Sequence, residues 1–336
     1  MPTWAQEAQF MLELDSLSAR APRAATLAAL ALALFGSWPV RAQNAARAGM
    51  ASFPTGTQQV AYSNLLQLRF TPAYPRLREH AVFQQFRGFE DFLRAAGLDP
   101  EADVDEVMLG WSGQSLSGPG SYGIAAGRFE PAHVQGFFTR NRLPVPSYGD
   151  SDLFVFRSGA DGKTTLFTFL NSSLAAFGRR HDLEAILDVQ DGSTPALNTN
   201  REFQGYAASL EGKSAQWGIL TGKAAANVAG NWLSRGQRAA PDLSAFSELV
   251  QAVLYRVDWD RGFTAHISIV SNTSESAEGL LKLLELLKAT PTLAAAVGSP
   301  GTFSLLQSME ARQDGSRLEL TISGPPEALA EILKVD

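Results

Sequence analysis

The most constraining feature of this sequence is a recurring order of elements, in which two strand-like segments lead into an amphipathic helix. The C-terminal third shows it best, since apolar residues alternate along 251–259 and 263–270 around the loop Asp260-Arg261-Gly262. A helix follows to about Lys288 and carries its apolar residues on one stripe. Strand pairs that lead into helices are typical of antiparallel sheets, so this order predicts an α+β fold with helices on one face.

The same order of elements occurs in the first half of the chain. Val104–Trp111 and Tyr122–Phe129 form a strand pair that precedes a helix opened by Pro131, and more strands follow. In the C-terminal third, a second strand pair at 308–313 and 317–323 follows the helix. We infer a duplicated ββα-type unit, arranged either as two sheets side by side or as one long sheet.

The length of the 260–262 loop predicts the register of the C-terminal hairpin and sorts its side chains between two faces. The predicted apolar pairs are Val257 with Ala265, Tyr255 with Ile267 and Val253 with Ile269. The other face carries Arg256 opposite His266, with Asp258 beside them, and these three are the candidate binding residues. The polar side of a half-exposed sheet is the alternative interpretation.

An export signal is predicted over residues 1–42. Arg20 and Arg23 precede an apolar run at 24–35, which is well short of the ~20 residues that a spanning helix needs. Val40-Arg41-Ala42 then matches a small-x-small cleavage site. We expect cleavage after Ala42, which leaves a mature chain without a transmembrane span. A retained anchor and a buried apolar helix are the alternatives.

The chain after residue 42 divides into a lead and two α+β halves. Residues 43–52 are small and polar, and we expect them to form a flexible lead. The first half spans 53–235 and the second spans 243–336, with a linker-like stretch between them. This length allows either one domain or two.

Four phenylalanines recur at every third position within the expected helical stretch 73–96. They are Phe83, Phe86, Phe89 and Phe92. A carrier of lipids or other apolar ligands would use these rings as a groove. A broad apolar helix face more often packs on a sheet, so core packing is the favoured interpretation.

Composition excludes several classes of protein. The 336 residues include no cysteine, which excludes disulfides, thiol chemistry, Cys zinc sites and a lipid-modified cysteine. Hydrophobic residues make up 45% of the chain and charged residues 18%, which excludes intrinsic disorder. The net charge of -6 argues against a nucleic-acid partner, because such binding draws on clustered Lys and Arg.

Motifs for catalysis, cofactors and metals are missing from the sequence. The histidines lie in no metal-ligand spacing; they are His80, His133, His181 and His266. Residues 118–123 match G-x-G-x-x-G, but a strand follows where a dinucleotide site needs a helix. His181 and Asp182 open a helix, where acidic residues favour the N-terminal dipole. We therefore expect no catalytic set, no cofactor and no metal.

Short motifs near the predicted mature start resemble those of exported bacterial families of unknown function. Phe53-Pro54-Thr55-Gly56-Thr57 is similar to their Pro-x-x-Thr opening, and a strand follows at 60–63 before Asn64-Leu65. Leu98-Asp99-Pro100, followed by Asp103-Val104-Asp105, fits the layout of the same families. The resemblance implies an exported α+β protein and supplies no functional residues.

Three functions are expected from these observations, in decreasing order. The first is an exported soluble protein, periplasmic or extracellular, with a non-enzymatic role in binding an envelope protein or an apolar ligand. The second is an envelope hydrolase whose site assembles only in the fold. The third is a carrier of lipids or other apolar ligands. A pocket that gathers a histidine with a carboxylate and a hydroxyl would favour the hydrolase.

Overall fold

The computed structural model describes residues 44–71, 74, 84–112, 121–157, 164–226, 248–259, 262–289 and 307–325. The predicted signal segment, the linker between the halves and the closing helix at 328–333 lie outside the described residues. The glycines at 118–120 and the side chains of Phe83, Phe86 and Phe89 lie outside them as well.

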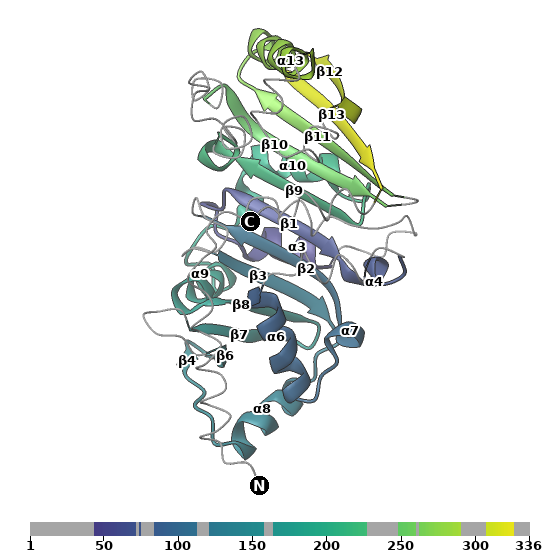
Figure 1. Ribbon diagram of the computed structural model, residues 1–336. Helices are drawn as coiled ribbons and strands as arrows, with labels where there is room; N and C mark the ends of the chain where they lie inside the picture. Colours follow the sequence, from purple (N-terminus) through teal and green to yellow (C-terminus); the bar gives the residue numbers. More distant parts are fainter. Residues whose placement is uncertain are drawn as a thin grey trace, which may run out of the picture.

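One antiparallel sheet of eleven strands runs through the described part of the chain (Figure 1). From edge to edge the order is β12-β13-β11-β10-β9-β1-β2-β3-β8-β7-β6. The strands are β1 (Gln59–Asn64), β2 (Val104–Trp111), β3 (Ser121–Gly127), β6 (Phe154–Arg157), β7 (Thr165–Asn171), β8 (Leu174–Arg179), β9 (Gln216–Thr221), β10 (Val250–Asp258), β11 (Phe263–Ser271), β12 (Glu310–Asp314) and β13 (Arg317–Gly324). A separate pair joins β4 (Ser147–Tyr148) to β5 (Ser151–Asp152). The predicted α+β class with antiparallel pairing is confirmed.

Helices separate the strands along the chain, and local signals explain several of their starts. They are α3 (Asn44–Ser52), α4 (Leu65–Leu68), α6 (Gln84–Ala95), α7 (Pro100–Asp103), α8 (Pro131–Arg140), α9 (Arg180–Gln190), α10 (Arg201–Leu210), α13 (Ser274–Ala289) and the short 3₁₀ helix η2 (Leu197–Thr199). Pro100 and Pro131 stand in the first turns of α7 and α8, where a missing N–H costs no helical hydrogen bond. Asn200 caps α10 by accepting the backbone N–H of Phe203.

The sheet contains the same supersecondary unit twice. In the first unit, β2, β3, α8, β7 and β8 occur in this order along the chain, with β4, β5 and β6 between α8 and β7. Their strands lie in the order β2-β3-β8-β7. In the second unit, β10, β11, α13, β12 and β13 lie in the matching order β10-β11-β13-β12. A helix and a strand precede each unit, α3 with β1 and α10 with β9, and β1 pairs with β9 at the centre. The repeated unit is therefore ββαββ, one strand pair longer than the expected ββα-type unit.

The two halves predicted from the sequence share this sheet. β9 belongs to the half 53–235 and β10 to the half 243–336, and the two strands pair antiparallel from Ala252↔Thr221 to Arg256↔Trp217. Of the two expected arrangements, the structure has the single long sheet.

Helices pack on both faces of the sheet, whereas the sequence predicted helices on one face. Buried side chains of α3, α9 and α10 belong to one core cluster, and this side is called the α9 face below. Buried side chains of α6, α8 and α13 belong to a second cluster on the opposite side, the α13 face. Alternating residues of one strand enter the two clusters, as Leu254 and Val253 of β10 do. Both sets of alternating residues are apolar at the centre of the sheet, so both faces need covering.

Residues 44–52 form the packed helix α3, so the prediction of a flexible lead over 43–52 is wrong. Ala45 and Ala46 are buried, and the Ala45 backbone N–H donates to the Glu106 Oε2 carboxylate oxygen on β2 at 2.9 Å. A Cβ at Gly49 would lie 2.4 Å from the Met108 sulfur, so a residue without a side chain lets α3 lie close to β2. The small residues that suggested flexibility are what permit this close approach, and alanine also favours helix.

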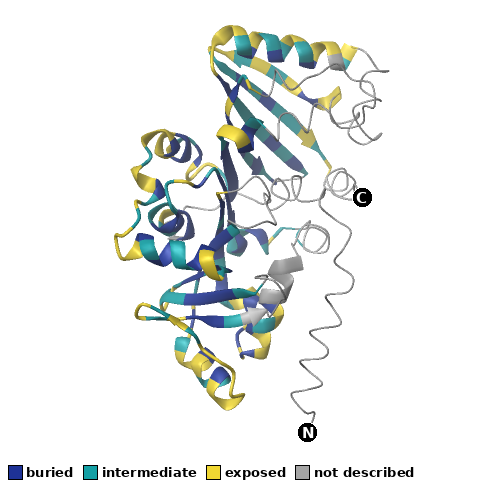
Figure 2. Ribbon diagram, turned by 90° about the vertical axis from the view of Figure 1, so that its left-hand side faces the viewer, coloured by how far each residue is buried: buried dark blue, intermediate teal, exposed yellow. Residues whose placement is uncertain are grey.

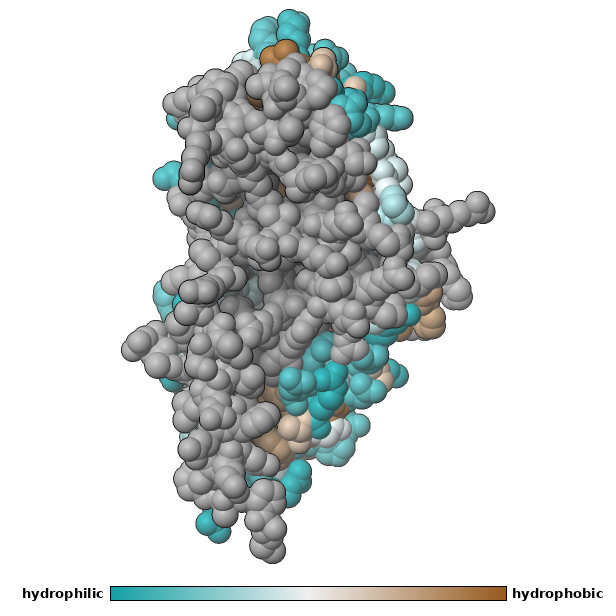
Figure 3. Space-filling model, viewed as in Figure 1, coloured by the Kyte–Doolittle hydropathy of each residue, from teal (hydrophilic) through white to brown (hydrophobic). Residues whose placement is uncertain are grey.

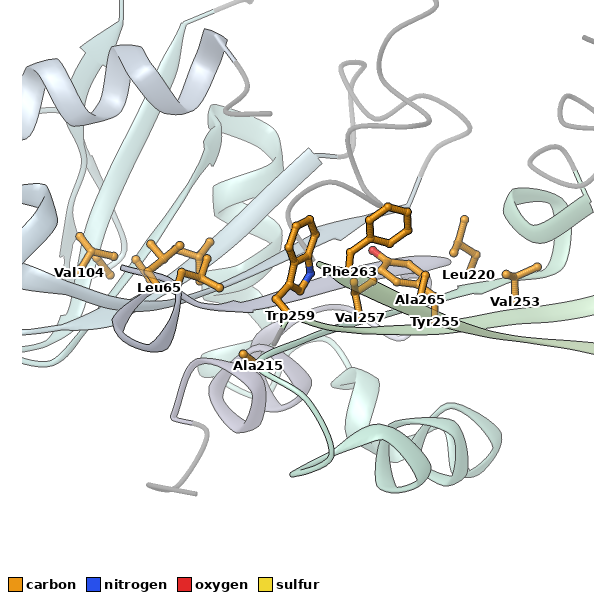
Figure 4. Close-up of a cluster of buried hydrophobic side chains, with 14 of the residues drawn as sticks. Leu65, Val104, Ala215, Leu220, Val253, Tyr255, Val257, Trp259, Phe263 and Ala265 are labelled. Atoms are coloured by element: carbon orange, nitrogen blue, oxygen red, sulfur yellow. The ribbon is translucent and has the colours of Figure 1, made fainter. Parts of the chain in front are cut away.

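The predicted register of the C-terminal hairpin is confirmed. The pairs in β10 and β11 are Val257↔Ala265, Tyr255↔Ile267 and Val253↔Ile269, with Arg256↔His266 on the other face. Figure 4 shows Tyr255, Val257 and Trp259 with Phe263 along this apolar side, which lies on the α13 face. The second predicted hairpin forms β12 and β13, with Gly315 at a positive φ of 58° in its turn.

Candidate functional site

Four adjacent strands of the second unit present polar side chains on the α9 side of the sheet. Register pairs place Arg256, His266, Thr321 and Glu310 in one row across β10, β11, β13 and β12. Neighbouring rows on the same face add further polar residues. The whole set, called the polar face below, is Arg256, Asp258, Thr264, His266, Ser268, Glu310, Arg312, Asp314, Arg317, Glu319, Thr321 and Ser323.

The structure brings together all three predicted binding residues. Arg256 and Asp258 are two residues apart on β10 and so point to the same side, where Arg256 Nη1 lies 2.7 Å from Asp258 Oδ2. His266 Nε2 lies 3.4 Å from the same oxygen. The side chains are 28%, 35% and 34% exposed, so water reaches all three. They form a half-exposed ion-pair cluster on a sheet surface.

Thr321 completes this cluster from the far side of His266. Thr321 Oγ1 lies 3.4 Å from His266 Nδ1, and the two residues are cross-strand partners. Burial and the Arg256 guanidinium lower the pKa of His266 below its ordinary 6.5, against the opposing effects of Asp258 and Glu319. The imidazole is therefore neutral at neutral pH, and its Nε2–H can donate to Asp258 while Nδ1 accepts from the Thr321 hydroxyl.

Two more hydrogen bonds tie β11 to β13 on the polar face. The Ser268 hydroxyl donates to Glu319 Oε1 at 2.8 Å, and the Thr264 and Ser323 hydroxyls lie 3.1 Å apart. Sequence reasoning missed Thr321, Glu319 and Ser268 as neighbours of the predicted site. The alternation along 317–323 indicates that Glu319 and Thr321 share the polar side of their strand. Only the pairing of β13 with β11 shows which residues of β11 they contact.

Exposure distinguishes the polar face from the rest of the sheet. In Figure 2, buried residues dominate the strands of the lower half of the molecule, and partly exposed residues dominate those of the upper half, where the second unit lies. On the corresponding face of the first unit, the side chains of Met108, Ile124 and Ala176 are fully buried beneath α3 and α9. Within the described residues, α10 packs on β9 and β10 at the margin of the polar face.

His181, the other histidine singled out from the sequence, lies apart from this cluster. It is exposed in the first turn of α9, beside the buried Asp182. Arg180 Nε there binds Glu184 Oε1 at 2.8 Å, four residues along the helix. These contacts agree with the interpretation of this segment as a helix start with favourable electrostatics.

Phe92 lies in the core of the first unit. Its ring centroid lies 5.2 Å from that of Phe167 and 5.9 Å from that of Phe138, and Phe138 in turn contacts Phe154 at 5.1 Å. These rings contact one another and fill the space between α6, α8 and the sheet. The arrangement supports core packing rather than a ligand groove.

No three His, Asp or Glu side chains in the described part of the chain gather as ligands for a metal ion. None of the helices in the described ranges combines the length and apolar character needed to cross a membrane.

Comparison with known proteins finds a likeness at the level of structure. No family model matches the chain, and no curated protein matches its sequence. Crystal form I of the protein TP0453 shares 10% identity at a TM-score of 0.49, covering 85% of this chain and 96% of that one. Crystal form III shares 10% identity at 0.48, with 85% and 97% covered. Crystal form IV shares 11% at 0.42, with 83% and 96% covered. Function is therefore argued from the residues of this chain.

Proposed function

We propose that this protein is an exported, non-enzymatic binding protein that contacts a protein of the cell envelope through the polar face of its second unit. The contrast between the two units supports this proposal. The same four-strand arrangement has a buried apolar surface on the α9 side of the first unit and a half-exposed polar surface in the second. Folding requires the first surface to be apolar, but it places no such demand on the second.

The charges on the polar face favour a protein partner over a polyanion. Three arginines, 256, 312 and 317, stand among four acidic residues, 258, 310, 314 and 319. A surface of alternating sign gives specificity and register against a partner with the opposite pattern, whereas a nucleic acid needs an excess of positive charge.

Export belongs to the same proposal. Residues 20–42 have the pattern expected of a cleaved signal, and cleavage after Ala42 would place the mature start one residue before α3. Such a cut preserves the contact of the Ala45 N–H with Glu106. N-terminal sequencing of the exported protein tests it, and a mature chain that begins before residue 20 would contradict it.

Affinity capture from an envelope fraction tests the binding surface. Arg256→Glu should weaken binding of the partner about thirtyfold or more, since truncating one member of a close charge pair at an interface costs about 2 kcal/mol or more. Arg180→Glu is the matched control, because Arg180 is also a partly exposed arginine in an ion pair, on α9 of the first unit. The control variant should capture the partner as the unmodified protein does.

A charge swap separates recognition from folding. Arg256→Asp combined with Asp258→Arg keeps an internal ion pair on β10 while reversing the pattern that a partner meets. The swapped protein should fold with unchanged circular dichroism and still lose the partner. Capture of the same proteins by every variant would contradict the proposed surface.

One arrangement favours a second candidate, an envelope hydrolase. Asp258, His266 and Thr321 place a carboxylate, an imidazole and a hydroxyl in contact, in that order. In hydrolases such a series serves as the group that orients the base, the base itself and the nucleophile. Asp258 is also bound by Arg256, at a shorter distance than to His266, which draws the carboxylate away from that role. A panel of ester, peptide and phosphate substrates decides, since turnover abolished by Thr321→Ala would establish the hydrolase and replace the binding proposal.

A further inference from the structure

The connection between α8 and β4 exposes aliphatic residues on the surface of the first unit. Its sequence is Asn141-Arg142-Leu143-Pro144-Val145-Pro146, and the first five of these residues are exposed. Leu143 is 40% exposed and Val145 is 38% exposed. In Figure 3, hydrophobic and hydrophilic residues lie side by side in the lower part of the molecule, where Figure 1 draws α8. The connection therefore presents aliphatic side chains next to a charged one.

This segment begins at a strained helix end. The Leu143 N–H donates to the Phe138 carbonyl oxygen at 2.9 Å, and the Arg142 N–H donates to that of Thr139 at 3.2 Å, which is the Schellman pattern. Glycine is the usual residue at the left-handed position of this motif, but here Arg142 occupies it, with a φ of 53°. Among the described residues other than glycine, no second one has a positive φ. Strain kept at an exposed arginine points to a use for its side chain.

Two prolines restrict the backbone of the segment. The ring of each proline fixes its own φ near about -65°, and it also pushes the residue before it out of the helical region. Because Leu143 precedes Pro144 and Val145 precedes Pro146, all four residues favour an extended conformation. None of these four belongs to a helix or strand. The pattern is typical of polyproline II, a left-handed helix with about three residues per turn, so successive side chains point in different directions.

Both ends of the segment are attached to the body of the first unit. The Schellman bonds tie its start to α8. At its end, the Pro146 carbonyl oxygen accepts the N–H of the fully buried Leu153 at 2.8 Å. Just beyond, the Tyr148 hydroxyl on β4 donates to Asp188 Oδ1 on α9 at 2.7 Å. A partner that binds a segment fixed in this way loses little free energy to ordering it.

We propose that residues 142–145 are a polyproline II docking segment for a protein whose groove is lined by aromatic side chains. Such grooves bind proline and aliphatic side chains along a preformed extended helix. A carboxylate at one end of the groove pairs with the Arg142 guanidinium, whose fork of N–H groups matches two carboxylate oxygens. The inference goes beyond the proposed function, because this segment lies in the first unit and the polar face lies in the second.

The directions of the exposed residues favour a groove over a lipid surface. Leu143, Pro144 and Val145 are all exposed, and they occupy the three edges of a polyproline II helix. A flat surface covers at most two of these edges, whereas the walls of a groove contact all three. Segments that bind lipid surfaces also carry Trp, Phe or Leu along one face of a helix, and this segment has no such face.

A panel of purified SH3, WW and EVH1 domains tests the proposal with the full-length protein. These domains share aromatic-lined grooves that bind polyproline II segments, so they stand in for the groove of the partner. At least one of them should bind, with the largest NMR chemical-shift changes at residues 141–147. Vesicles of phosphatidylethanolamine and phosphatidylglycerol should produce no shifts in this segment.

A proline variant tests the conformation of the segment. Pro144→Ala should weaken binding of the best domain about twofold to fivefold, because alanine no longer restricts the backbone before binding. Pro195→Ala is the matched control. Pro195 is also exposed, and its carbonyl oxygen accepts the Thr55 N–H, a bond that alanine keeps. The control should bind the domain as the unmodified protein does.

An arginine variant separates recognition from helix capping. Arg142→Gly should weaken binding about threefold to fivefold, the effect of losing one exposed ion pair. The same change should raise the melting temperature, since glycine adopts a positive φ without strain. If Arg142 served only to end α8, stability would change and binding would not. Arg140→Ala is the control, because it removes an equal charge at an exposed position just before the segment.

Several outcomes overturn the docking proposal. They are failure of every domain in the panel to bind, unchanged binding by both Pro144→Ala and Arg142→Gly, and shifts confined to other parts of the chain. Vesicle binding that Leu143→Asp abolishes would assign the segment to a lipid surface instead. Arg256→Glu should leave domain binding unchanged, so failure of this inference and failure of the proposed function are distinguishable.

Discussion

The two ββαββ units share one topology and differ in what covers them. In the first unit, the strands are packed by α3 and α9 on one face and by α6 and α8 on the other. In the second unit, α13 packs on one face, and the opposite face carries the half-exposed polar cluster. An antiparallel sheet needs only one buried face to be stable. The second unit already buries its α13 face, so the residues on its opposite face can be polar.

The difference also shows where the chain is constrained by packing. On the α9 side, the first unit presents Ile124 on β3, and the second presents Ser268 on β11. Ile124 is fully buried, whereas Ser268 is half-buried and hydrogen bonded to Glu319. Fully buried positions such as Ile124 are constrained by stability. Half-buried polar positions such as Ser268 are less constrained, and the proposed function uses them for recognition.

The largest expected effect comes from truncating a side chain in the doubly covered unit. Ile124→Ala should lower the free energy of unfolding by about 3 kcal/mol, within the usual range of about 2–5, because it leaves a cavity between helices and sheet. Ser268→Ala should cost about 1 kcal/mol, since it removes one half-exposed hydrogen bond. Urea unfolding measures both, and equal costs would break the comparison between the units.

The pairing of β9 with β10, where the two predicted halves meet, gives the next effect. Gly218 on β9 faces the buried Tyr255 ring on β10, and a Cβ at this glycine would collide with that ring. Gly218→Ala should therefore cost about 1–3 kcal/mol through overpacking. Gly279→Ala on α13 is the matched control with the opposite sign, because nothing lies within 4 Å of its Cβ. There, alanine should stabilise the helix by about 0.5–1 kcal/mol.

The smallest effect is a pH dependence that His266 of the second unit contributes. Because the folded state lowers the pKa of His266, the unfolded chain binds more protons as pH falls below 6.5. Stability from this group is therefore present above 6.5 and is lost on acidification toward the lower folded pKa. The His266→Gln variant should show a shallower loss of melting temperature between neutral pH and pH 5.

A second variant tests the cause of that pKa shift. Arg256→Met removes the neighbouring guanidinium, so it should also reduce the acid sensitivity that His266 confers. A melting temperature with the same pH dependence in all three proteins would show that the polar face does not sense protons.

Much of the second unit could be predicted because its signals are local. Alternation along β10 and β11, together with a three-residue loop, sets which residues face one another, and the structure has that register from Val253↔Ile269 to Arg256↔His266. Arg256, Asp258 and His266 meet for this reason. Thr321 and Glu319 could not be placed beside them, because the pairing of β13 with β11 joins segments about fifty residues apart.

The sequence by itself determined the strands, their hairpins and the class of fold, since side-chain alternation and turn residues act over a few positions. Only the tertiary structure decided the pairing of β1 with β9, the packing of α3 on Glu106, and the distribution of helices over both faces. Each of these depends on contacts between distant segments, whose free energy comes from burying surfaces together rather than from any local pattern.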